Sequence, residues 1–173
     1  MNHRTLPLLL ALLLLAALTG CAGSGSGTAG AGTTDMGDLQ KAMLAADDTL
    51  PEMLSLTSED EGAEKKFHYL SDFPYEKLDG FLLSYSADGQ LADELAVLAV
   101  KDPADVNAAA DSLRAHMDSR LKLYQTYGPR QAARVEAAQV FTRDRYAVLL
   151  ICDGAQAVKD AFDAFLDGQS GEG

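Results

Sequence analysis

The sequence is short of the residues on which most small catalytic and metal sites depend. It has no tryptophan, only two cysteines and only three histidines. It contains no HExxH, no CxxC and no phosphate loop of the GxxxxGK[ST] kind, which excludes the zinc and nucleotide sites that those motifs build. It also lacks a GxSxG elbow, although a Ser-His-Asp triad is defined by geometry and stays open. The sequence therefore predicts no enzyme, no metal site and no cofactor.

Basic residues are also few. The chain has 14 Lys and Arg against 26 Asp and Glu, a net charge of -12, and its first 20 residues hold one basic residue, Arg4, and no acid. Nucleic-acid binding depends on clustered Lys and Arg, so nucleic acid is not an expected partner. Electrostatic adhesion to anionic lipid head groups is excluded on the same ground. A solvated acidic surface is expected, with a surface for cations or a cationic partner as the alternative.

No apolar run is long enough to span a bilayer. The longest, residues 5–18, is rich in leucine and follows Arg4, whereas a membrane-spanning helix takes about 20 apolar residues. A basic start, a short apolar stretch and small residues at its end are typical of a signal peptide. We therefore expect a signal peptide over residues 1–20.

Leu18, Thr19, Gly20 and Cys21 end this segment. They resemble the lipobox of bacterial lipoproteins, in which cleavage falls between Gly20 and Cys21 and the cysteine thiol receives a diacylglyceryl group. Two acyl chains anchor a protein firmly, because each buried methylene contributes about 0.8 kcal/mol. We expect a protein held by lipid on Cys21 at the extracytoplasmic face of the cell membrane. An ordinary secretory signal and an uncleaved anchor are the alternatives.

A tether and one domain follow the lipobox. Residues 22–34 contain five glycines and no charge, a composition that stays flexible and spans roughly 20 Å. We expect residues 21–34 to form the lipidated cysteine and tether, 35–168 a single domain, and 169–173 a disordered tail. If Cys21 is acylated, Cys152 has no disulfide partner within the chain and is expected to be a small buried hydrophobe.

The strand-like segments come in two pairs. Residues 80–86 and 94–101 form the first pair, joined through an Asp-Gly turn, and residues 136–142 and 145–152 form the second. Such short apolar runs around turn residues are typical of hairpins. The run 94–101 is apolar on both of its faces, which predicts a strand at the centre of its sheet.

Helical patterns surround and separate these hairpins. The first begins at Asp35 and ends before Pro51, and the longest begins after Asp102 and ends at Gly128-Pro129. The last closes at Gly168 and begins after Asp153, which is placed with Gln156 as a capping box. The caps and apolar spacings are those of amphipathic helices. The order helix, hairpin, long helix, hairpin, helix predicts an α+β domain with a four-stranded, mainly antiparallel sheet and helices packed on one face.

Four short pieces of the chain resemble domain-of-unknown-function family 4358, a family of bacterial lipoproteins. They are ADELAV at residues 92–97, YGP at 127–129, YAV at 146–148 and CDG at 152–154. Their order and spacing over residues 80–166 carry the resemblance, and Leu98 departs from an aromatic that the family favours. The resemblance implies an envelope lipoprotein of a Gram-positive type of cell. Relatives encoded beside membrane-bound O-acyltransferase systems imply a cell-surface assembly partner.

Three side chains are candidates for a binding surface: Glu94, Tyr127 and Tyr146. Glu94 begins the two-faced strand, and the alternatives for it are a plain strand-end carboxylate or, with Asp88 and Asp93, a calcium patch. The two tyrosines have the amphipathic rings that contact surfaces use, although packing of those rings in the core is the alternative.

The expected function is that of a lipid-anchored extracytoplasmic binding or accessory protein, non-enzymatic, which engages another component of the cell envelope. The alternative is a small envelope enzyme, a hydrolase or an acyl-transfer accessory factor. That alternative requires His68 or His116 in a pocket next to a carboxylate or hydroxyl. A divalent-cation sensor built on the acidic surface is a third hypothesis.

Overall fold

The computed structural model describes residues 34–170. The expected signal peptide, the Gly20–Cys21 cleavage and lipidation site and the tether up to residue 33 lie outside the described residues, as do residues 171–173. Among the described residues, no helix is long and apolar enough to cross a membrane.

Five antiparallel strands form one sheet in the order β1-β2-β3-β5-β4. The strands are β1 (Met53–Thr57), β2 (Leu78–Ser86), β3 (Glu94–Val100), β4 (Gln139–Arg143) and β5 (Tyr146–Ile151). Both expected hairpins, β2–β3 and β4–β5, are confirmed, and β3 is the central strand. The prediction of four strands is wrong, because β1 pairs with β2 and adds an edge strand.

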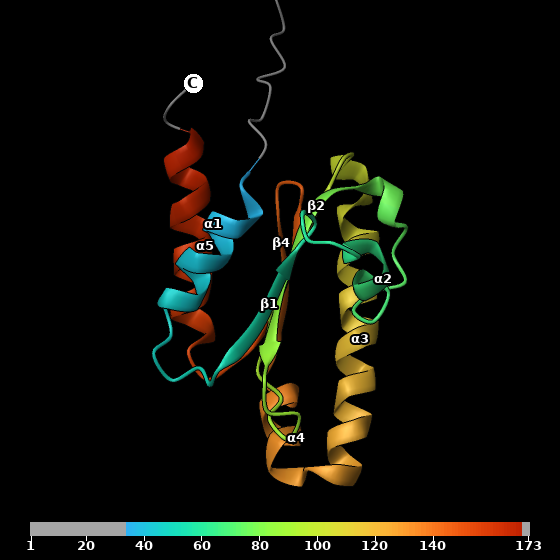
Figure 1. Cartoon of the computed structure of the whole chain (residues 1–173), viewed down its shortest axis with the longest axis vertical. Coiled ribbons are helices and arrows are strands. Elements are labelled where there is room, and N and C mark those ends of the chain that lie inside the picture. Colours follow the sequence, from blue (N-terminus) through green and yellow to red (C-terminus); the bar gives the residue numbers. More distant parts are fainter. Residues whose placement is uncertain (1–33, 171–173) are drawn as a thin grey trace, which may run out of the picture. The chain divides into compact units, whose positions relative to one another are not determined.

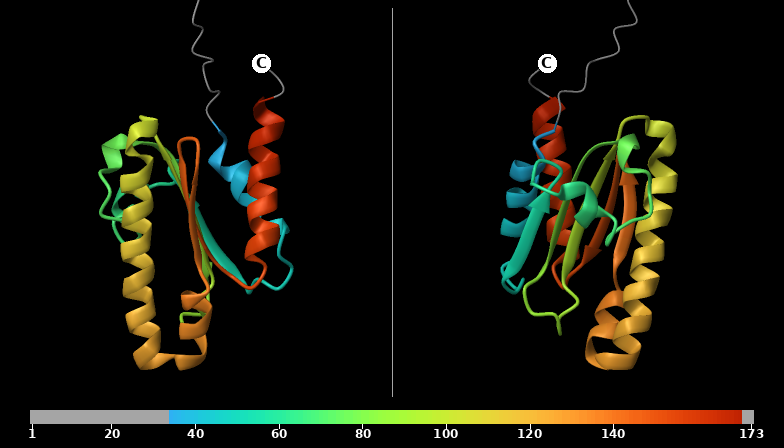
Figure 2. Two further views of the ribbon diagram at one scale, coloured as in Figure 1. Left: turned by 180° about the vertical axis from the view of Figure 1, so that it is seen from behind. Right: turned by 45° about the vertical axis from the view of Figure 1, so that its right-hand side comes forward.

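Helices cover both faces of the sheet, so the prediction of helices on one face is also wrong (Figure 1). On one face lie α1 (Met36–Ala45) and α5 (Ala155–Ser170); on the other lie α2 (Ala63–Phe67), α3 (Val106–Tyr127) and α4 (Pro129–Glu136). Figure 2 shows the resulting three layers from behind and at an angle. The reason is the apolar character of both sides of β3 and β5, which leaves two surfaces to be kept from water.

Side chains of β3 and β5 alternate between two cores. In the core under α3, Ala96, Leu98 and Leu149 pack with residues such as Phe81 and Leu113. The core under α1 and α5 contains Leu95, Val97, Val148, Leu39 and Phe162. Strand geometry sends successive residues to opposite faces, so each strand contributes to both cores.

The first residues of α1 and α5 are capped by aspartates, one adjacent in the sequence and one distant. Asp35 accepts a hydrogen bond from the Asp38 N–H, as expected for the start of α1. At the start of α5 the expected capping box is wrong: Asp47, more than a hundred residues earlier, accepts from the Gly154 N–H at 2.9 Å. α5 continues to Ser170, two residues into the expected disordered tail.

The helix α3 covers only part of its face of the sheet. It contacts β3, β4 and β5, while the short α2 packs against β2 through Phe67 and Phe81, whose ring centroids are 5.3 Å apart. The parts of β1 and β2 beyond α2 carry Leu54 and Tyr85 as exposed side chains. This incomplete cover leaves room for a cavity on the α3 face.

Candidate functional site

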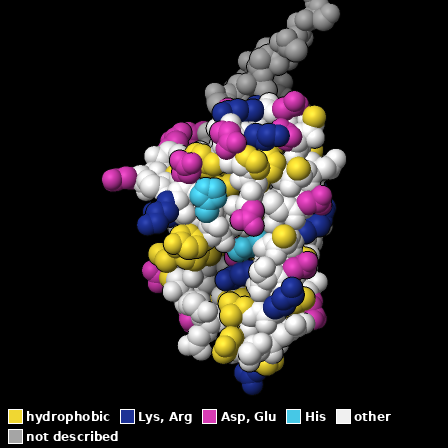
Figure 3. Space-filling model, turned by 90° about the vertical axis from the view of Figure 1, so that its right-hand side faces the viewer, with side chains coloured by type: hydrophobic (Ala, Val, Ile, Leu, Met, Phe, Trp, Pro, Cys, Tyr) yellow, Lys and Arg dark blue, Asp and Glu magenta, His cyan; other side chains and the backbone are white. Residues whose placement is uncertain are grey.

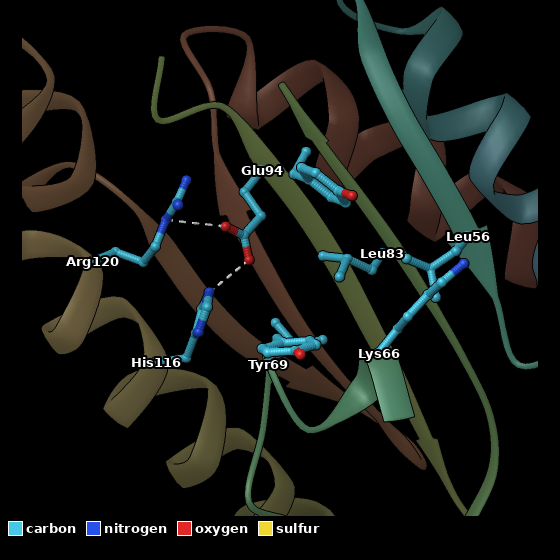
Figure 4. Close-up of a pocket in the computed structure, with 9 residues that line it drawn as sticks. Leu56, Lys66, Tyr69, Leu83, Glu94, His116 and Arg120 are labelled. Carbon is cyan, nitrogen blue, oxygen red and sulfur yellow. Dashed lines mark hydrogen bonds and ion pairs between the residues drawn. The ribbon is translucent and has the colours of Figure 1, made fainter. Parts of the chain in front are cut away.

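A cavity of about 380 Å³ opens beside α3 at this incompletely covered part of the sheet. It is lined by Leu56, Lys66, Tyr69, Leu70, Leu83, Tyr85, Glu94, His116 and Arg120 (Figure 4). Small-molecule sites are mostly apolar pockets of roughly 300–1,000 Å³ with a few convergent polar groups. The cavity has this size and composition, so it is the candidate functional site.

Glu94 is the buried polar centre of the cavity, with 2% of its surface exposed. Its Oε1 lies 2.7 Å from Nε2 of His116, and its Oε2 lies 3.2 Å from Nε of Arg120. An ionised carboxylate removed from water needs such partners, because an unpaired buried charge is costly. The three side chains therefore form one unit, here called the Glu94 triad.

The long helix α3 positions both partners of Glu94. His116 and Arg120 are four residues apart, a spacing that places them on the same side of a helix. Arg120 is further oriented by Tyr124: its guanidinium carbon lies 5.2 Å from the centre of that ring, whose hydroxyl donates to the Leu91 carbonyl. The helix thus presents two cationic or protonatable groups to a carboxylate on the central strand.

Arg120 is held without using all of its hydrogen-bonding capacity. Its Nε–H is buried and makes no well-directed hydrogen bond within residues 34–170, although the Glu94 carboxylate is close. Its Nη2 reaches the Ala92 carbonyl at 3.4 Å, a long contact. A guanidinium has five N–H donors, so this group retains donors for another acceptor.

The walls of the cavity are apolar and its mouth is aromatic. Leu56, Leu70 and Leu83 are buried, whereas Tyr69 is 76% and Tyr85 38% exposed. Lys66 extends along the side of the cavity that Leu56 forms, opposite Arg120 and His116 (Figure 4). Large exposed aromatic side chains around a concave site are typical of a contact surface.

A second hollow of about 220 Å³ adjoins the first and shares Tyr69, Leu70 and His116 with it. Histidine side chains lie near the middle of this face, beside hydrophobic groups (Figure 3). The second hollow also includes His68 and serines of α3. The Ser112 and Ser119 hydroxyls donate to helix carbonyls, and His116 is bonded to Glu94 instead. Among the described residues, no hydroxyl nucleophile is paired with either histidine.

The expected binding residues do not lie on one surface. Glu94 is in the cavity, but Tyr127 is 82% exposed at the end of α3. Tyr146 is buried on the opposite face of the sheet, where it packs against Phe162 and hydrogen-bonds to Thr34. Of the three side chains, only Glu94 therefore lines the cavity.

The three acidic residues proposed as a calcium patch are divided among different partners. Asp93 binds Nη1 of Arg134 at 2.7 Å, while Glu94 belongs to the triad. Burial raises the pKa of Asp93 above its ordinary value, and Arg134 opposes that rise. Residues 34–170 contain no group of three or more side chains suited to hold a metal ion.

Cys152 is half-buried beside the core under α1 and α5. Burial raises the pKa of its thiol to about 12, with the nearby Asp47 and Asp93 adding to the effect. The thiol is therefore protonated at neutral pH and is a poor nucleophile. This environment agrees with the expected role as a small apolar side chain.

Sequence reasoning missed most of the cavity. Arg120, Lys66, Tyr69 and Tyr85 were not expected at a site, because they come from α3, α2, the turn after α2, and β2. One usable signal was present: an apolar stripe on the long helix borders a histidine and an arginine at four-residue spacing, and a buried strand begins with a glutamate. That strand carries the carboxylate that those two side chains neutralise.

The cavity lies wholly within the part of the chain that matches a known family. Residues 52–152 match the family described as Domain of unknown function (DUF4358), a range that contains all five strands, α3 and every residue that lines the cavity. No curated protein and no solved structure matches the chain. The match starts and ends earlier than the expected range of 80–166, and it confirms the family. The chain belongs to the DUF4358 family.

Proposed function

We propose that this chain is a lipid-anchored extracytoplasmic binding protein that holds a component of the cell envelope in the cavity between β1, β2 and α3. The Glu94 triad carries the proposal, since it places buried polar groups at an apolar cavity. Stability alone does not account for it, because apolar side chains often replace a buried ion pair without loss. Convergent polar groups in an apolar pocket are what ligand recognition requires.

The anchor is the first part of the proposal. Lipid on Cys21 would hold the protein at the membrane and residues 22–34 would set its reach from the surface. Replacement C21S is expected to move the protein from the membrane fraction to the soluble fraction of cells. Retention of C21S in membranes after a high-salt wash would contradict the anchor.

The cavity is the second part and is tested by filling it. L56W places a large ring in the cavity, whereas L54W makes the same change on the same strand at a side chain outside the cavity. Native mass spectrometry of protein purified from its own membranes is expected to show a bound small molecule on the wild type and on L54W. The same species should be absent from L56W.

Two results would count against a binding role. One is an identical bound mass on all three proteins, and the other is no bound mass on any of them. Thermal unfolding of L56W and L54W serves as the control, because a folded L56W shows that loss of the ligand reflects the filled cavity.

Catalysis is the second candidate, favoured by the contact between His116 and Glu94 inside the cavity. A carboxylate that orients an imidazole is the arrangement that general acid–base catalysis uses. The two candidates differ in what becomes of the bound molecule. A binding protein returns it unchanged, whereas an enzyme converts it at a rate that H116Q lowers, and mass spectrometry of the incubated ligand separates the two.

A further inference from the structure

We infer that the cavity takes a small amphiphilic anion, a carboxylate or a phosphate monoester with an apolar body. This inference rests on the proposed binding function and names the chemistry of the ligand. It follows from the charge balance of the cavity, the free donors of Arg120, and the nature and size of the walls.

The cavity is cationic in an acidic protein. Lys66 and Arg120 each carry a positive charge, Glu94 carries the one negative charge among the lining residues, and His116 adds a further positive charge when protonated. The whole chain has a net charge of -12. Lys66 makes no ion pair within residues 34–170. An anion entering the cavity therefore meets a cation that no carboxylate of the described residues neutralises.

Arg120 provides the directional part of recognition. Glu94 engages the Nε edge of the guanidinium, the Ala92 carbonyl lies near Nη2 and the Tyr124 hydroxyl is also close. These contacts do not use all five N–H donors of the group. Carboxylates and phosphates accept two hydrogen bonds side by side from such a group. Tyr124 and Glu94 fix the guanidinium, so little order is lost when an anion binds.

A cationic ligand does not fit the same geometry. Both oxygens of Glu94, the carboxylate of the cavity, face cationic or protonatable partners at 2.7 and 3.2 Å. Lys66 lies across the cavity from those partners (Figure 4). An ammonium group would have to displace Arg120 or His116 from Glu94 and would be repelled by Lys66.

The walls set the size and polarity of the rest of the ligand. Leu56, Leu70 and Leu83 offer no hydrogen-bonding side chains, and the rings of Tyr69 and Tyr85 lie at the mouth. A volume of about 380 Å³ holds roughly a dozen non-hydrogen atoms at about 30 Å³ each. A single medium-length chain or a small ring system with one anionic group has this size.

Four probes of equal chain length test the inference: octanoate, octyl phosphate, octanol and octylammonium. Each is equilibrated by dialysis with the full-length protein in nanodiscs of zwitterionic lipid, and empty nanodiscs correct for partition into the bilayer. At least one anion is expected to bind at least tenfold more tightly than octanol and octylammonium. The ratio between octanoate and octyl phosphate shows whether the carboxylate or the phosphate is preferred.

Charge variants identify the groups responsible. R120Q and K66Q are each expected to reduce the preference for the anion over octanol at least threefold. K65Q, at the neighbouring exposed lysine outside the cavity, should leave it unchanged. K66Q changes an exposed side chain and so keeps the test decisive if R120Q fails to fold.

Equal binding of octanol and the anions, tighter binding of octylammonium, or no binding of any probe would each overturn the inference. None of these results bears on the binding proposal itself, which the L56W purification tests separately. Anion binding that L56W leaves unchanged would also overturn the inference, because the anion would then bind outside the cavity.

Discussion

Buried polar groups on the two faces of the central sheet have different kinds of hydrogen-bond partner. Under α1 and α5, Gln40 is buried and its amide donates to the Leu56 and Leu83 carbonyls at 3.2 Å. Under α3, Glu94 is also buried, but its partners are side chains that border a cavity. A polar group paired with backbone inside a closed core serves the fold. A polar group shared among side chains at a cavity is the one that a ligand can reach.

The largest expected difference between the faces is in packing. F162A, in the closed core under α5, should lower the free energy of unfolding by about 3–5 kcal/mol, because it empties a fully enclosed site. L83A borders the existing cavity and already lacks contacts on one side, so its cost should be near 2 kcal/mol, at the low end for leucine. Urea denaturation measures both. Equal losses would mean that the α3 face is packed as tightly as the other.

The next effect concerns the cap that joins α1 to α5. Asp47 accepts hydrogen bonds from Gly154 and Thr49, and D47A should cost about 2–3 kcal/mol near neutral pH, as expected for hydrogen bonds to a charged group. D48A, at the exposed neighbouring aspartate, is the matched control and should cost little. Urea denaturation of D47A and D48A measures the two losses in the free energy of unfolding.

The stabilisation by Asp47 should also depend on pH. Burial raises the pKa of this carboxyl, but the hydrogen bonds from Thr49 and Gly154 together outweigh that rise. The net effect is a pKa below the ordinary 3.8. A depressed pKa in the folded state gives stability that is present above the ordinary value and is lost as the pH falls through the folded value. The difference between wild type and D47A should therefore shrink as the pH is lowered below about 4. A constant difference would contradict the role of the ionised carboxylate.

A smaller loss is expected at the Glu94 triad. E94Q leaves Arg120 and His116 without their counter-charge, but both keep some access to water, so the cost should be about 1–3 kcal/mol. D118N, on the exposed side of the same helix, is the control. Thermal and urea unfolding of the two variants give the comparison. A loss no larger than that of D118N would show that the triad contributes nothing to stability.

The smallest effects on stability are expected at two exposed tyrosines, which should differ in their effect on binding. Y69A and Y127A remove rings that are 76% and 82% exposed, and each should change the free energy of unfolding by no more than about 0.5 kcal/mol. Only Y69A should weaken octanoate binding in the dialysis assay, because Tyr69 lines the cavity and Tyr127 does not. Equal effects of the two substitutions on binding would remove the distinction between them.

The elements with strong periodic patterns were predictable. β3 was identified as central because both of its faces are apolar, and α3 because its apolar residues recur at helical spacing. β1 was missed because Leu56 is its one buried residue and its backbone pairing with β2 leaves no mark in the sequence. α4 was missed because Gly128-Pro129 was read as a helix end, whereas proline at a first helical position also begins one.

The site was less predictable than the fold. Glu94 was identified by its position at the start of an apolar strand, but its partners lie more than twenty residues away on α3. Which face of α3 meets which end of β3 is decided by the strand order β3-β5-β4, and local patterns do not contain that order. Whether Tyr146 lies at a contact surface or in the core was left open for the same reason, since one residue of register decides which face a strand side chain occupies.

The hydrogen bond from Thr34 to Gln169 brings the two ends of the described domain together, and Figure 1 shows α5 ending close to where the described chain begins. A domain whose two ends lie close together tolerates circular permutation and insertion into another chain. The ends can be joined by a short linker and the chain reopened at the exposed Asp88-Gly89 turn with every strand pairing retained. By the same geometry, we expect residues 34–170 to tolerate insertion into a surface loop of another protein.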